Sequence, residues 1–143
     1  DLLRVFSEFY GESLEWFFEQ WVYAPMRPIY AFAWSVHEEG AGYRLRLRLQ
    51  QQQTHLIARR DPTLPPVYIM PVEFTLRYAD GTSEVKRLWN RAREETFDIL
   101  LSRRPVSVTF DEGNWILKEL RAGFGESFAA LEPSPRSVRS RVR

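Results

Sequence analysis

Residues 43–50 read YRLRLRLQ, and this unbroken alternation of apolar and charged side chains decides the fold. Successive side chains of a β-strand point to opposite faces of the sheet, so the stretch predicts a strand with one dry and one solvated face. The dry face carries Tyr43, Leu45, Leu47 and Leu49, and the solvated face carries Arg44, Arg46 and Arg48. A register shift of one residue would bury the arginines, and the pairing of this strand is therefore firmly specified.

The sequence on both sides of this strand also has a period of two. Before it, large and small side chains alternate over residues 30–36. After it, further strands are expected at residues 67–78, 84–89, 96–101, 106–110 and 115–120. Pro71 interrupts the first of these and argues for a bulge or an edge, while Asp80-Gly81 is a strong hairpin signal. About seven short strands separated by turns predict a mainly β fold, an antiparallel immunoglobulin-like β-sandwich.

One or two α-helices are expected before the sandwich. Residues 1–10 place apolar side chains on one helical face, and Gly11 ends that helix. A second helix begins at Ser13, which is a capping residue, and ends at Pro25 and Pro28. Its apolar side chains recur at helical spacing and are Leu14, Phe17, Phe18, Trp21 and Val22. So wide an apolar stripe requires a partner surface.

The order of these features resembles a known family. A Leu-x-Trp-Phe-Phe-x-Gln-Trp helix, a proline turn and a strand that ends in glutamines resemble the zinc aminopeptidases of the gluzincin type, which are aminopeptidase-N-like metallopeptidases. The resemblance covers roughly residues 12–118 and continues through Pro66, Pro71, Asp80-Gly81, Phe97, Pro105 and Asp111. Met26 is a departure, because the family usually has a glycine there.

The resemblance implies a role for each part of the chain. In the family this pattern marks the exit from the catalytic domain into a small C-terminal β-sandwich. Residues 1–27 would then be the end of a catalytic-type domain with its connector, residues 28–122 the β-sandwich domain, and residues 123–143 a tail. The candidate interdomain contacts are Phe17, Phe18, Trp21 and Tyr23. The parent protein would use zinc to cleave N-terminal residues from peptides, and its catalytic domain would be the partner of this chain.

The chain also opens inside a helical pattern and lacks an initiator methionine, so we expect a piece of a longer protein. An apolar helix left exposed in such a piece would favour self-association.

The sequence carries no recognisable active site. A gluzincin holds zinc through HExxH on a helix and a downstream glutamate, whereas this chain has His37 and His55, neither with a partner at ligand spacing. It has no nucleophile elbow and no phosphate-cradling glycine loop. Residues 111–114 lack the spacing of a calcium loop and are better explained as a tight turn. We therefore expect no catalytic residue, metal ligand or cofactor in this chain, and zinc in the parent alone.

Composition argues against several kinds of partner. The absence of cysteine excludes a disulfide framework. A net charge of +1 gives no general reason to expect nucleic acid, and no apolar run approaches the roughly 20 residues that span a bilayer. The arginine row (Arg44, Arg46 and Arg48) lacks the interleaved exposed aromatics of nucleic-acid-binding strands. We expect neither nucleic acid nor a membrane as partner, and the sequence does not indicate a compartment.

Three functions remain open from the sequence. The leading hypothesis is a non-catalytic interdomain β-sandwich module of a zinc aminopeptidase-like protein. The alternative is a stand-alone immunoglobulin-like module that binds a protein or an anion through the arginine row, with salt-sensitive affinity that Arg46→Glu abolishes. The third and weakest is an independent hydrolase.

Overall fold

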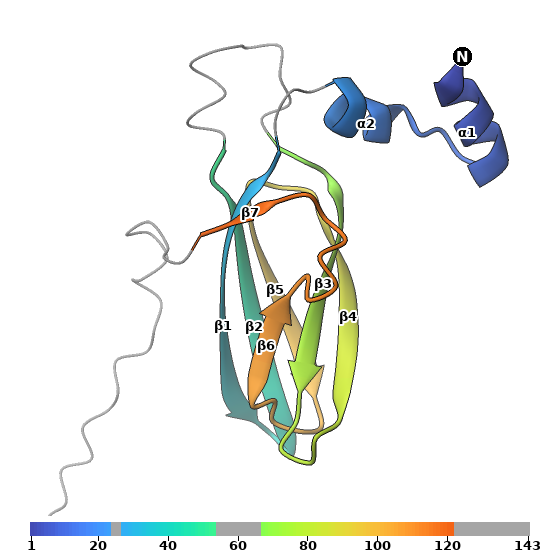
Figure 1. The fold of residues 1–143 in the computed structure, drawn as a ribbon. Helices are drawn as coiled ribbons and strands as arrows, with labels where there is room; N and C mark the ends of the chain where they lie inside the picture. Colours follow the sequence, from blue (N-terminus) through green and yellow to red (C-terminus); the bar gives the residue numbers. More distant parts are fainter. Residues whose placement is uncertain (24–26, 54–66, 122–143) are drawn as a thin grey trace, which may run out of the picture.

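Two β-sheets packed face to face form the body of the protein (Figure 1). The computed structural model describes residues 1–23, 27–53 and 67–121. In chain order the described elements are α1 (Leu2–Tyr10), α2 (Glu15–Phe18), the π-helix η1 (Glu19–Tyr23), β1 (Ile29–Glu39), β2 (Gly42–Gln51), β3 (Met70–Arg77), β4 (Ser83–Asn90), β5 (Glu94–Leu101), β6 (Ser107–Phe110) and β7 (Glu119–Leu120). The predicted mainly β sandwich, preceded by helices, is confirmed.

The strand with alternating leucines and arginines lies inside the larger sheet. This sheet has the strand order β5-β2-β1-β7, and the smaller sheet has the order β4-β3-β6. The described pairings are antiparallel, except that β7 runs parallel to β1 beside Ile29 and Tyr30. Leu47 of β2 lies opposite Trp34 on one side and Phe97 on the other. Aromatic neighbours on both sides fix the register that the sequence pattern specifies.

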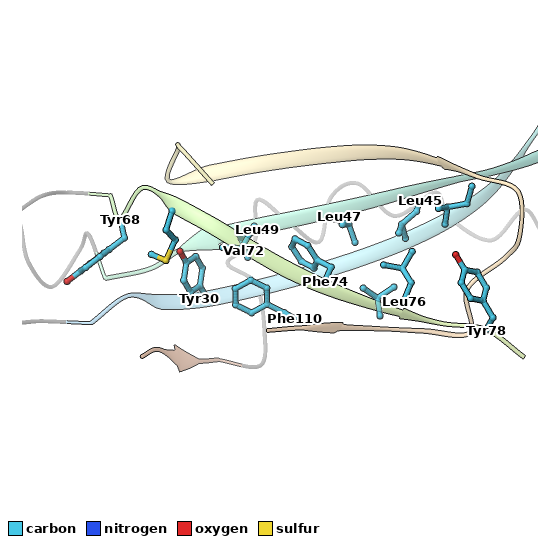
Figure 2. Close-up of a cluster of buried hydrophobic side chains, with 13 residues drawn as sticks. Tyr30, Leu45, Leu47, Leu49, Tyr68, Val72, Phe74, Leu76, Tyr78 and Phe110 are labelled. Atoms are coloured by element: carbon cyan, nitrogen blue, oxygen red, sulfur yellow. The ribbon is translucent and has the colours of Figure 1, made fainter. Parts of the chain in front are cut away.

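The core lies between the two sheets, where Figure 2 shows side chains of β2 and β3 pointing toward one another. The three leucines of β2 are fully buried, as predicted, and each contributes roughly 1.5–3 kcal/mol on transfer scales. The ring of Phe74 lies 5.4 Å from that of Phe110 and 6.0 Å from that of Phe32, measured between ring centroids. These rings connect the central strand of one sheet to β1 of the other.

Pro71 lies inside β3 at a place where the strand is locally an edge. Strand β6 pairs with β3 from Phe74 to Arg77, so Pro71 has a strand neighbour on the β4 side alone among the described residues. The missing N–H of proline therefore costs no ladder hydrogen bond. Of the two predicted alternatives, a bulge or an edge, the structure has an edge at Pro71.

Some predicted elements have different limits. The expected strand at residues 115–120 is shortened to β7, because the preceding residues form a loop tied to Asp111. The second helix changes to π geometry after Phe18, and Leu14 rather than Ser13 occupies its N-cap position. The predicted proline elbow with Met26, the connection that contains His55 and the tail at residues 123–143 lie outside the described residues.

A buried glutamine clamp joins the end of β2 to the start of β3. The side chain of Gln51 is fully buried, its Oε1 accepts a hydrogen bond from Tyr68 N at 2.8 Å, and its Nε2 donates to Tyr68 O at 2.7 Å. The same Nε2 donates to Asn90 Oδ1, and Gln53 Nε2 donates to Gln51 Oε1 at 2.6 Å. Asn90 Oδ1 also accepts from the hydroxyl of Tyr30 at 3.3 Å. Each polar group is paired, which removes the desolvation cost of burying it.

Gln51→Leu should lower the free energy of unfolding by about 3 kcal/mol, because it leaves the Tyr68 amide and the Gln53 carboxamide buried without these partners. Urea unfolding followed by tryptophan fluorescence measures the change. The matched control is Gln52→Leu, one residue along, where the side chain is half-buried and bonds Gln50 Oε1. An equal loss in both variants would contradict a special role for the clamp.

Candidate interdomain docking surface

The carboxamide of Gln20 attaches α2 and η1, which together we call the helical segment, to the smaller sheet. Gln20 is 5% exposed, and its Nε2 donates to Ile69 O at 3.2 Å while Ile69 N donates to its Oε1. Nε2 also donates to Trp16 O at 2.7 Å. The carboxamide thus pairs with both backbone groups of Ile69, as a neighbouring strand would, and it caps β3 just before Pro71.

Aromatic contacts reinforce this attachment. The Trp21 ring lies 5.3 Å from Tyr68, and the Trp16 ring lies 5.9 Å from Trp89, between ring centroids. Tilted and edge-on pairs of this kind contribute roughly 0.5–1.5 kcal/mol beyond their buried area. The Gln20 bonds and these ring contacts attach α2 and η1 to the sandwich.

The four predicted contact residues divide into two pairs. Phe18 is buried and Trp21 packs against the sandwich core, so both stabilise this chain itself. Phe17 is 41% exposed and Tyr23 is 65% exposed, so both leave surface for another molecule. Sequence spacing identified the stripe but not this division, which depends on where the short helix meets the sheet.

Helix α1 presents an unburied apolar face. Its contacts with the described part of the chain include a hydrogen bond from Leu14 N to Ser7 Oγ at 3.0 Å and a ring contact between Phe6 and Phe18 at 6.4 Å. No residue of α1 is buried, and Phe9 is 94% exposed. The other exposed large apolar side chains of this helix are Leu2, Val5, Phe6 and Tyr10. A face of this size is typical of a surface that a partner covers.

A loop tied to Asp111 presents further apolar side chains beside α2. The Asp111 carboxylate accepts hydrogen bonds from Trp115 N at 3.0 Å and Ile116 N at 3.1 Å, and it forms a buried ion pair with Lys118. Asp111 and Asn114 have positive φ angles of 45° and 51°, which these two residue types tolerate better than most. The predicted tight turn at residues 111–114 is present, with Asn114 N donating to Asp111 O at 3.0 Å.

Trp115 of this loop is 80% exposed and Leu117 is 71% exposed. An apolar groove of about 370 Å³ lies between the loop and the helical segment. Its lining includes Trp16, Phe17, Met70, Pro71 and Trp115. We call α1, Phe17 and the two exposed loop side chains the helical-end surface. The sequence predicted the turn at residues 111–114 but a strand at residues 115–120, and the one signal for the exposed loop there is an aspartate seven residues before a lysine.

The arginine row is paired with carboxylates. Arg46 donates to both carboxylate oxygens of Asp98, at 2.7 and 2.8 Å. Arg44 forms an ion pair with Glu39, and its Nη1 lies 3.8 Å from Asp98 Oδ2. Hydrogen bonding from Arg46 lowers the pKa of the Asp98 carboxyl. Arg48 also has an interaction partner. These pairs reduce the positive charge that the row offers to an anionic ligand.

The described residues contain no group of three or more His, Cys, Asp or Glu side chains that could hold a metal ion. His37 lies near the end of β1, and its partner across the strand pair is Arg44, which is not a metal ligand. No described helix is both long enough and apolar enough to cross a membrane.

Comparison of this chain with family models, with curated proteins and with solved structures finds no match.

Arg46→Met should raise the pKa of the Asp98 carboxyl toward its ordinary value near 4, because it removes the hydrogen bonds that favour the ionised form. A lowered pKa in the folded state stabilises the fold above the unfolded pKa, and this contribution disappears as the pH falls through the folded pKa. The two proteins should therefore differ in unfolding free energy at pH 7 and converge below about pH 4. NMR titration of the carboxyl measures the pKa directly. Arg4→Met on α1 serves as the control and should leave it unchanged.

Proposed function

We propose that this chain is a non-catalytic β-sandwich module that fastens a neighbouring domain through its leading helices. The observation that carries the proposal is the contrast between the two helices. Gln20 and Trp21 attach α2 and η1 to the start of β3, whereas no residue of α1 is buried and its apolar face meets the described part of the chain at the Phe6–Phe18 ring contact. A helix bound at one end and exposed over an apolar face is suited to lie between two bodies.

The size of the exposed surface supports a domain-sized partner. Aromatic side chains bury 150–250 Å² each, so the exposed side chains of α1, with Trp115 and Leu117, offer on the order of 1,000 Å². A standard protein interface buries roughly 800 Å² on each partner. The helical-end surface is therefore large enough for a stable contact with another domain.

We further propose that the neighbouring domain is the catalytic domain of a zinc aminopeptidase-like parent protein. The support is the resemblance in sequence order, with a Trp-Phe-Phe helix followed by a proline turn and a strand that ends in glutamines. The parent would hold the zinc ion and cleave N-terminal residues from peptides. This chain would fix the position of the catalytic domain.

The helical role can be tested with Phe9→Asp. In this chain the change should alter the unfolding free energy by no more than about 0.5 kcal/mol, because the side chain is 94% exposed. In a longer polypeptide that includes the preceding domain, it should cost about 2–3 kcal/mol of domain–domain stability. Thermal unfolding and hydrogen exchange of α1 in both proteins measure the difference. Glu8→Ser on the same helix is the control, and an equally small effect in the longer polypeptide would refute the proposal.

The absence of catalysis can be tested with the purified chain. We expect no turnover of aminoacyl-arylamide substrates above background, with or without added zinc, because the sequence has no HExxH motif. A zinc-dependent rate that persists through further purification would contradict the proposal.

A further inference from the structure

Strand β1 has a long open edge. Its second neighbour in the sheet, β7, pairs with it at Ile29 and Tyr30, and beyond these residues no described strand lies on that side. Tyr30 O accepts a hydrogen bond from Arg121 N at 2.9 Å, whereas Ile29 O accepts one from Gln52 N at 2.7 Å. Backbone groups alternate in direction along a strand, so the even-numbered residues of β1 face the open edge. These are Phe32, Trp34, Val36 and Glu38.

The other exposed edges in the described part of the protein carry features that block strand addition. Strand β6 is four residues long, and the uncovered end of β3 contains Pro71 and is capped by the Gln20 carboxamide. Strand β7 is two residues long. Charged residues are distributed along the other two edge strands, with Glu84, Lys86 and Arg87 on β4 and Glu94, Glu95 and Asp98 on β5. Short edges, prolines and charges are the usual means of preventing edge-to-edge pairing.

The edge of β1 has none of these features over residues 32–37, which read FAWSVH. The segment contains no proline, no glycine and no Asp, Glu, Lys or Arg. A hollow of about 580 Å³ opens beside it, lined by Trp34, Val36, Ala79, Arg104, Pro105 and Val106. Among the described residues the backbone groups of this segment have no strand partner on that side, and an added strand would find an apolar space for an inward-pointing side chain.

We propose that this edge pairs with the same edge of a second copy of the chain, antiparallel and centred on Ser35. In this register Phe32 lies opposite Glu38 of the second copy and Trp34 lies opposite Val36 of the second copy. The backbone N–H and C=O of all four residues point toward the open edge, so both groups of each residue find a partner. The two four-stranded sheets then become one continuous sheet across a two-fold axis.

Self-complementarity favours a second copy over an unrelated strand. The outer side chains at the junction are Ala33, Ser35 and His37, which are small or uncharged and place no like charges opposite one another. The pairing ends at Phe32, before the position where β7 pairs with Ile29 and Tyr30, so β7 keeps its place. Figure 1 shows β1 on the left of the sandwich and both α-helices at the upper right, so the two surfaces are separate. The dimer therefore does not depend on the proposed interdomain role.

Sedimentation equilibrium of the full chain should show a dimer whose fraction rises with concentration. Val36→Pro removes an N–H that faces the open edge and takes no part in the pairing with β2. It should raise the dimer dissociation constant roughly tenfold or more while leaving the circular dichroism spectrum unchanged. The matched control is Val85→Pro on β4, whose N–H also faces outward because Tyr78 N bonds Thr82 O on the inner side. The control should still dimerise.

Charge exchange at position 35 tests the register itself. Ser35 lies next to its own symmetry mate in the proposed dimer, at a pair where side chains approach closely. Ser35→Glu and Ser35→Lys should each weaken the dimer roughly fivefold through like-charge repulsion, and mixing the two variants should restore association. In the monomer position 35 lies opposite Arg46 on the exposed face, so neither change disturbs the core.

Three results would overturn the proposal. The first is a wild-type monomer at all concentrations. The second is a dimer that survives both Val36→Pro and Ser35→Glu, and the third is a mixture of the position-35 variants that does not associate. A dimer that Phe9→Asp abolishes and Ser35→Glu leaves intact would assign self-association to α1 instead.

Discussion

The fold depends on side-chain amides that stand in for backbone at places where strand pairing stops. The Gln51 carboxamide bonds both backbone groups of Tyr68, and the Gln20 carboxamide bonds both backbone groups of Ile69. Two consecutive residues before β3 are thus held from two directions, one from β2 and one from the helical segment. Without the Gln51 bonds, the backbone groups of Tyr68, which is 1% exposed, would lose buried hydrogen-bond partners next to the core.

The Asp111 loop supplies similar bonds on the same edge of β3, where Asp111 N donates to Glu73 O at 2.7 Å. Its carboxylate accepts two backbone hydrogen bonds and pairs with Lys118, which leaves neither charge exposed to solvent. Removing one partner of such a buried pair is strongly destabilising, because the other charge would stay buried and unpaired. Buried polar side chains therefore hold the surface loop and the helical segment in place.

The sequence was sufficient for the fold class and for the faces of the strands. Alternation in β2 predicted that the leucines are buried and that the arginines are outside, and Asp80-Gly81 predicted the turn between β3 and β4. Periodicity succeeds here because a sheet with one dry face must repeat every two residues. The buried state of Phe18 beside the exposed state of Phe17 was not predictable, because it depends on a π-helical turn and a distant glutamine contact.

The site is harder to read from sequence than the fold. The exposed Trp115 follows from hydrogen bonds to an aspartate that looks like an ordinary turn residue. The pairing of Arg46 with Asp98 needs β5 to lie beside β2, which is a long-range contact. Local sequence patterns carry no information about such pairings. The sequence therefore suggested that the arginine row offers more unpaired positive charge to a ligand than the structure shows.

The bond between Gln20 and Ile69 also couples the rotation of the helices to the integrity of the sheet. A turn of η1 away from β3 would break both carboxamide bonds and expose one donor and one acceptor of the main chain. Two hydrogen bonds to the backbone of the sandwich therefore oppose a tilt of η1. A load on η1 would pass through these bonds directly into the start of β3.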